Sequence, residues 1–129
     1  MITMTTAVIY SSKTGNTKKV AEYIAQKIGA ECIDVKTNPD LSKYDRVILG
    51  AGVYAGKPGK AMTKFVEANK DSLSNASLFI TCLYNDEKGA KQLEKIAEGY
   101  GIADAIFFDK AKKQIGVDGS KLEEYIKTL

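Results

Sequence analysis

Short apolar segments of strand length alternate along this chain with segments whose apolar residues recur at helical spacing. The strand-length segments occupy residues 6–10, 31–35, 46–51, 77–83 and 105–108. Most of them are nearly continuous apolar runs instead of a regular alternation with polar residues, which is typical of parallel strands that are buried on both faces. Because parallel strands need a long crossover connection, and a helix is the usual one, this alternation predicts an open, doubly wound α/β sheet.

Segments of helical periodicity follow most of these strands. The clearest apolar stripe consists of Val20, Ala21, Ile24, Ala25 and Ile28. Gly29 comes directly after it, where a helix C-terminus favours glycine. Further helices are expected around residues 62–66, 90–97 and 122–129. We expect Gly99 or Gly101 to end the second of these, and Asp118 or Ser120 to cap the last. With no linker or repeat in sight, a single domain over residues 1–129 is expected.

The composition narrows the chemistry that the chain can perform. The 129 residues include no His, which excludes Ser-His-Asp and Cys-His catalysis and any imidazole metal site. Cys32 and Cys82 form neither a CxxC pair nor a zinc-binding spacing. Proton chemistry would therefore need a strongly shifted carboxyl, Lys, Cys or Tyr side chain, or a bound cofactor.

The charge is mildly positive and evenly spread. The formal net charge is +3, and Arg46 is the only Arg among 19 basic residues. Nucleic-acid readers favour Arg and gather their charge on one face, so we expect no nucleic-acid partner. No apolar run approaches the ~18 residues of a membrane span, so we expect none. The N-terminus lacks the basic segment of a signal peptide, which together with the unpaired cysteines predicts a cytoplasmic protein.

The loop at residues 11–17 gathers hydroxyl groups around a glycine between the first predicted strand and its helix. Its sequence is Ser11-Ser12-Lys13-Thr14-Gly15-Asn16-Thr17. Gly15 allows a tight backbone turn, and the first amides of a helix lack partners and carry the positive end of the helix dipole. These features favour a site for a phosphate group. An ordinary capped turn between strand and helix is the alternative.

This loop resembles the flavodoxin fingerprint T/S-x-T-G-x-T, which binds the phosphate of FMN. The residues expected at the phosphate are Ser11, Ser12, Lys13, Thr14, Gly15, Asn16 and Thr17. The resemblance extends along the chain and is greatest to compact flavodoxin-like domains related to bacterial menaquinone-dependent protoporphyrinogen oxidase. It implies a five-stranded parallel sheet of order 2-1-3-4-5 in a three-layer sandwich, with FMN bound noncovalently at the carboxyl edge of the sheet.

The loop after the third strand is similar to the flavodoxin loop that packs an aromatic ring on the flavin. The flavin is flat and largely apolar with polar edges, so its site needs an aromatic face and nearby backbone groups. Tyr54 is the candidate stacking residue, Gly50 and Gly52 would let the backbone approach, and Gly56 suits a type II turn over residues 54–57. The predicted contacts are Gly52, Val53, Tyr54, Ala55 and Gly56. The alternative is a surface loop with Tyr54 packed on the protein itself.

The loop after the fourth strand is the third that would reach the flavin. The predicted contacts are Cys82, Leu83, Tyr84 and Asn85, with Tyr84 as a second stacking face. Asp86 and Glu87 are better explained as first-turn acids of the next helix. Cys82 is better explained as a small buried apolar residue than as a reactive thiol, since no basic neighbour is visible to lower its pKa.

The resemblance implies an electron carrier that shuttles between a reductase and an acceptor protein. Lys13, Lys57 and Lys60 would form a basic rim at the flavin, suited to acidic docking surfaces. An FMN-dependent oxidoreductase, such as a quinone reductase or a protoporphyrinogen-oxidase-like enzyme, is the alternative. The carrier is favoured because no side chain is a compelling acid or base.

Overall fold

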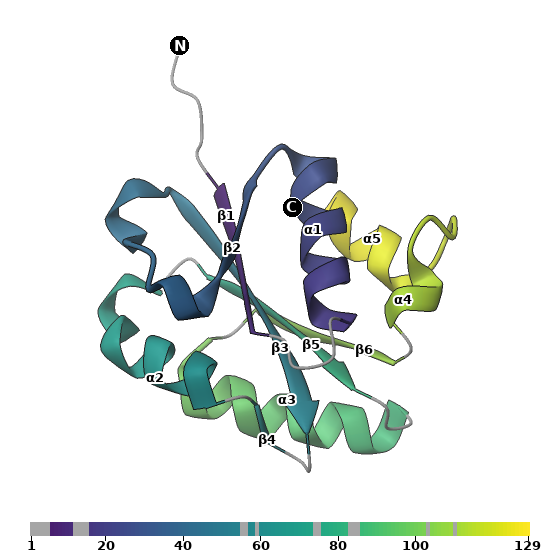
Figure 1. Ribbon diagram of the computed structural model, residues 1–129. Coiled ribbons are helices and arrows are strands. Elements are labelled where there is room, and N and C mark those ends of the chain that lie inside the picture. Colours follow the sequence, from purple (N-terminus) through teal and green to yellow (C-terminus); the bar gives the residue numbers. More distant parts are fainter. Residues whose placement is uncertain are drawn as a thin grey trace.

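Five parallel strands form the centre of the protein in the computed structural model (Figure 1). The structure describes residues 6–11, 16–54, 57–58, 60–73, 76–82, 86–102, 104–109 and 111–129. The parallel strands are β1 (Thr6–Ser11), β2 (Glu31–Asp34), β3 (Arg46–Tyr54), β5 (Ser77–Cys82) and β6 (Asp104–Asp109). Their spatial order is β2-β1-β3-β5-β6, which confirms the predicted order 2-1-3-4-5. The additional strand β4 (Lys57–Pro58) pairs antiparallel with the end of β3.

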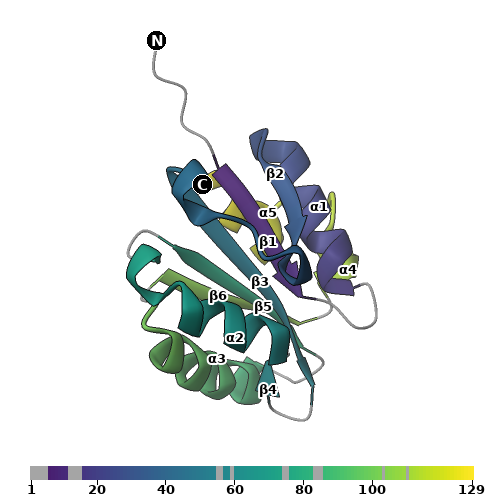
Figure 2. The same ribbon diagram turned by 60° about the vertical axis from the view of Figure 1, so that its left-hand side comes forward.

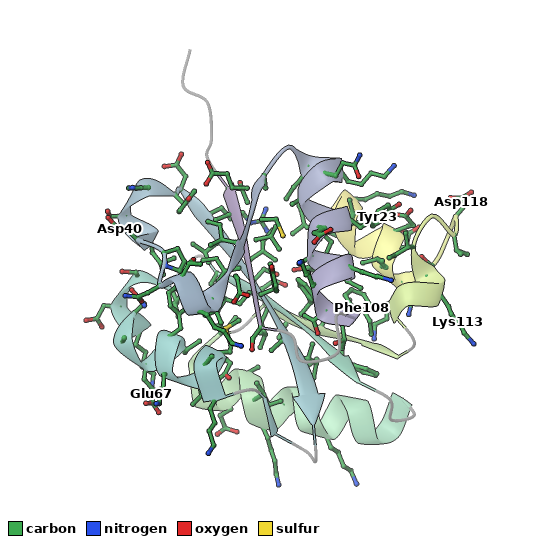
Figure 3. All side chains as sticks on the ribbon, in the orientation of Figure 1. Tyr23, Asp40, Glu67, Phe108, Lys113 and Asp118 are labelled. Atoms are coloured by element: carbon green, nitrogen blue, oxygen red, sulfur yellow. The ribbon has the colours of Figure 1, made fainter. Side chains whose placement is uncertain are left out.

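Helices cover both faces of the sheet, as the three-layer prediction requires (Figures 1 and 2). One face carries α1 (Asn16–Ile28), α5 (Lys121–Lys127) and the short α4 (Ala111–Gln114), and the other carries α2 (Lys60–Ala68) and α3 (Asp86–Tyr100). In the first layer, the Tyr23 hydroxyl of α1 donates a hydrogen bond to Glu123 Oε1 of α5; Tyr23 is labelled in Figure 3. Among the described residues, no helix is long and apolar enough to cross a membrane.

The continuous apolar character of the strands follows from these two layers. Successive side chains of a strand point to opposite faces of the sheet. In β1, Ala7 and Ile9 enter the core under α2 and α3, whereas Val8 and Tyr10 enter the core under α1 and α5. Each strand therefore needs apolar residues at odd and even positions alike.

Helix ends lie where the sequence predicts them. Gly29 follows α1 and Gly101 follows α3, both with φ of +70°, a backbone conformation that glycine adopts without steric cost. Of the two candidate caps for the last helix, Ser120 is the one used, since its Oγ accepts a hydrogen bond from the Glu123 amide at 3.2 Å. Gly101, and not Gly99, ends α3.

The sequence pattern does not predict several short elements. They are α4, the two-residue β4, and the 3-10 helices η1 (Val35–Thr37), η2 (Leu41–Lys43) and η3 (Lys70–Ser72). A single turn is too short to show helical periodicity, so nothing in the spacing of apolar residues predicts it. Strand β3 also continues past the predicted end at Ala51 to Tyr54, because its last two residues pair with β4.

A close contact between neighbouring strands shapes the core under α1 and α5. Gly50 of β3 is the register partner of Phe79 of β5. A Cβ atom at Gly50 would lie 2.2 Å from Cζ of the Phe79 ring, so only glycine fits there. The fully buried Phe79 ring in turn lies 6.1 Å from the Phe108 ring and 6.5 Å from the Tyr125 ring, measured between centroids. Phe108, labelled in Figure 3, lies between the sheet and this helical layer.

Replacing Gly50 with alanine should therefore destabilise the fold. The added methyl group must displace a ring held by two other aromatic side chains, so we expect a loss of about 1–3 kcal/mol in the free energy of unfolding. Urea denaturation followed by circular dichroism measures this loss. Gly99→Ala is the matched control, because a Cβ there meets nothing within 4 Å and should stabilise α3 by about 0.5–1 kcal/mol. Equal stability of Gly50→Ala and the wild type would contradict the contact.

Candidate functional site

The carboxyl ends of three neighbouring strands meet at one edge of the sheet. Ser11 at the end of β1 is the register partner of Ala51, and Gly52 is the partner of Thr81 near the end of β5. The carboxyl ends of β1, β3 and β5 therefore lie side by side, and α1 and α3 begin at the same edge (Figure 1). In doubly wound sheets this edge, at the point where the strand order reverses, is where ligands bind.

The N-terminus of α1 has the charge pattern of an anion site. β1 ends at Ser11 and α1 begins at Asn16. The first turn of α1 contains no acidic residue, although acids are the side chains that the positive end of a helix dipole favours. It contains the exposed Lys18 and Lys19 instead, and Lys18 lies 4.0 Å from Glu22 one turn further along. The helix dipole and the two lysines together favour a bound anion here.

Thr17 lies in the first turn of α1, at this edge of the sheet, and is completely buried. Its Oγ1 is 2.7 Å from Oγ1 of Thr81, a hydrogen bond in which either hydroxyl can donate. Thr81 is only 8% exposed and stands next to last in β5. The hydrogen bond therefore joins the helix that follows the first loop to the strand that precedes the third loop.

The second loop arises from the hairpin of β3 and β4. Tyr54 pairs with Lys57, so the chain reverses between them, as the predicted turn over residues 54–57 requires. Gly52 is buried in β3 beside Thr81. Ala55 and Gly56 lie outside the described residues, as do the side chains of Val53 and Tyr54. The stacking role of Tyr54 therefore stays a prediction.

The remaining predicted contacts are only partly within the described residues. β5 ends at Cys82 and α3 begins at Asp86, so Asp86 and Glu87 occupy the first turn of α3 as predicted. The backbone of Cys82 is described and its side chain is not. The residues outside the described ranges are Ser12, Lys13, Thr14, Gly15, Leu83, Tyr84 and Asn85.

One titratable side chain near this edge, that of Tyr10, has a pKa shifted away from neutral pH. Burial raises the pKa of Tyr10, next to last in β1, and the nearby Asp34 carboxylate raises it further. Away from this edge, burial likewise raises the pKa of the Cys32 thiol of β2 to about 11 and that of Tyr125, the partner of Ser77 at the other end of β5, to about 12. In the described part of the chain, every resolved pKa shift moves a group away from neutrality.

The sequence places Thr81 at the start of the segment that leads into the third loop, but it does not identify Thr81 as a residue of the site. The available signal was a single Thr in a strand that is otherwise almost wholly apolar. A polar residue near a strand end usually marks only the exit of the chain into a loop, so the strand alone does not single it out. Its partner Thr17 is 64 residues away in the sequence.

These features define a doubly wound α/β protein in which α1 begins at the carboxyl edge of the sheet with two lysines and no acid in its first turn. The model of the flavodoxin domain family matches residues 7–113. The chain therefore belongs to the flavodoxin domain family, and the resemblance inferred from its loops is confirmed.

Individual relatives agree with this assignment. Protoporphyrinogen IX dehydrogenase [quinone] from Escherichia coli K12 is 29% identical over 79 residues, which cover 56% of this chain and 44% of that protein. The chain spans less than half the length of the curated relatives it matches.

Solved structures show the same fold. Oxidised flavodoxin 1 from Bacillus cereus superposes with a TM-score of 0.64 at 22% identity, covering 96% of this chain and 93% of that one. A flavoprotein in complex with FMN from Lactobacillus acidophilus gives 0.62 at 18% identity, covering 88% and 99%. At these identities the likeness concerns the fold.

Proposed function

We propose that this chain binds FMN noncovalently at the carboxyl edge of its sheet and carries electrons between a reductase and an acceptor protein. The observation that carries the proposal is the N-terminus of α1, which has Lys18 and Lys19 and no acid in its first turn. It follows a loop with the flavodoxin fingerprint, in a chain that belongs to the flavodoxin domain family.

The residues at the edge fit the two parts of the cofactor. The phosphate is a dianion, and the free amides, dipole and lysines of α1 attract it. The ring system needs flat apolar contact, for which Tyr54 and Tyr84 are the proposed residues. The full proposed set is Ser11, Ser12, Lys13, Thr14, Gly15, Asn16, Thr17, Gly52, Val53, Tyr54, Ala55, Gly56, Cys82, Leu83, Tyr84 and Asn85. When bound, FMN supplies the redox chemistry, and the protein holds and orients it.

The charges around this edge favour an acidic partner. Lys18, Lys19 and Lys60 are exposed at the N-termini of α1 and α2, and the net charge is +3. Complementary charge speeds the encounter of redox proteins more than it tightens the complex. We therefore propose reductase and acceptor proteins with acidic docking surfaces. Cys32 carries a free thiol, which suits the cytoplasmic location that we propose.

A second function is supported by one relative. The similarity to protoporphyrinogen IX dehydrogenase [quinone] favours an FMN-dependent oxidoreductase that acts on a quinone or a porphyrinogen. Steady-state turnover of such a substrate without any protein partner would support this alternative. Electron transfer that requires a second redox protein would support the carrier.

The first expected result is flavin binding by the purified chain. Apoprotein mixed with FMN should retain flavin absorbance through gel filtration and should quench flavin fluorescence, with a Kd in the micromolar range or below, about −8 kcal/mol or stronger. Fluorescence titration measures the Kd. A chain that leaves FMN fluorescence unchanged at micromolar concentrations would overturn the proposed function.

Reversing the charge of Lys19 should separate stability from phosphate binding. In Lys19→Glu the new acid favours the helix dipole, so the apoprotein should gain a few tenths of a kcal/mol in unfolding free energy. The same acid repels the phosphate and should weaken FMN binding by about 1 kcal/mol, roughly fivefold, with riboflavin affected far less. Fluorescence titrations with both flavins test this, and added salt should shrink the difference.

Lys95→Glu is the matched control for Lys19→Glu. Lys95 is exposed in the middle of α3, so its reversal changes the net charge equally without altering the first turn of α1. The Lys95→Glu variant should keep the wild-type preference for FMN over riboflavin. If both variants lose the same preference, the phosphate does not lie at the N-terminus of α1.

A further inference from the structure

The hydrogen bond between Thr17 and Thr81 is unusual in its surroundings. The buried polar residues of the described chain are Thr17, Ser77 and Thr81, and all three lie on the side of the sheet under α1 and α5. A buried hydroxyl pair adds little net stability over an apolar pair of the same shape. Stability alone therefore does not explain why two hydroxyls meet at the carboxyl edge.

The two hydroxyls can donate one more hydrogen bond than the bond between them uses. Each hydroxyl has one proton and two lone pairs. The bond between Thr17 Oγ1 and Thr81 Oγ1 consumes one of the two protons, and either atom can supply it. When Thr81 donates, the proton of Thr17 is left for another acceptor. A donor that itself accepts a hydrogen bond is polarised and donates more strongly, especially away from water.

The position of the pair matches that use. Thr17 is the second residue of α1, within the helix turn that carries Lys18 and Lys19. Thr81 stands opposite Gly52 of β3 in the sheet register, one residue before β5 ends. A phosphate dianion at this helix terminus accepts hydrogen bonds and donates none, so it fixes the direction of the bond with Thr81 as donor.

We propose that Thr81 is a positioning residue for the flavin phosphate: it donates to Thr17 and holds the Thr17 hydroxyl with its proton directed to a phosphate oxygen. This inference rests on the proposed function, in which Thr17 belongs to the phosphate site. Thr81 acts only through Thr17, since it belongs to β5 and not to the phosphate loop.

The same strand offers a matched control. Ser77 is at the opposite end of β5, two positions before Phe79, and its side chain lies on the same side of the sheet as that of Thr81. Its Oγ is 2.5 Å from the hydroxyl oxygen of Tyr125 in α5, and it is fully buried. Ser77→Ala therefore also breaks a buried hydroxyl pair on β5, but far from the carboxyl edge.

The experiment compares FMN and riboflavin, which differ by the phosphate. The full chain and its Thr81→Val, Thr81→Ser and Ser77→Ala variants are titrated with both flavins by fluorescence quenching, and their melting temperatures are recorded. Thr81→Val should weaken FMN binding about tenfold and riboflavin binding less than about twofold. Thr81→Ser keeps the hydroxyl and should restore most of the FMN affinity. Ser77→Ala should lower the melting temperature without changing the ratio of the two affinities.

A double variant tests whether Thr81 works through Thr17. In the Thr17→Val background, adding Thr81→Val should leave the ratio of FMN to riboflavin affinity unchanged, because the relay is already broken. Thr81→Ala replaces Thr81→Val if the latter does not fold.

The outcomes are distinct. The role of Thr81 is overturned if Thr81→Val leaves the ratio of FMN to riboflavin affinity unchanged, as it would if both affinities fell equally. It is also overturned if Ser77→Ala changes that ratio as much as Thr81→Val does. Neither result would contradict the proposed function. A wild-type chain that binds neither flavin overturns the proposed function, and the inference with it.

Discussion

The contact of Gly50 with the Phe79 ring is the constraint on which the rest of this structure depends. The Phe79 ring of β5 fills the space that a side chain on Gly50 of β3 would occupy. The same ring packs against the rings of Phe108 and Tyr125. Three alternate side chains of β5 then serve one helical layer: Ser77 bonds to α5, Phe79 fills the core, and Thr81 bonds to α1. The same strand is thus bonded to the first turn of α1, where the proposed phosphate site lies.

The proposed site asks the protein for position and charge, because a bound cofactor would perform the chemistry. Burial raises the pKa of the Tyr10 hydroxyl and that of the Cys32 thiol further above neutral pH. The groups proposed to hold an anionic ligand are backbone amides, hydroxyls and lysines, which all donate hydrogen bonds. Such a site suits a cofactor that performs the reaction itself, which is why the absence of His in the sequence is compatible with redox function.

The sequence predicted the layers, the strand order and the helix ends because each has a local signal or a family resemblance. The apolar run at residues 47–51 indicated a strand buried on both faces, and Gly29 indicated the end of α1. The sequence interpretation gave Gly50 a role in backbone approach to the flavin, whereas the structure packs Gly50 against the Phe79 ring. This contact could not be predicted, because Phe79 lies 29 residues further along the chain and no local pattern encodes the register between two such strands. The same holds for Thr17 and Thr81. The contacts proposed for residues 12–15, 55–56 and 83–85 stay predictions.

The lysines in the first turn of α1 have a consequence for the life of the protein in a cell. Lys18 and Lys19 oppose the dipole of their own helix, so the chain without an anion carries an electrostatic cost that a bound anion removes. Binding to the native state alone raises stability further by mass action. Molecules lacking a ligand would then unfold more often and reach proteases sooner. Abundance of the protein would follow the supply of its cofactor without any dedicated regulator.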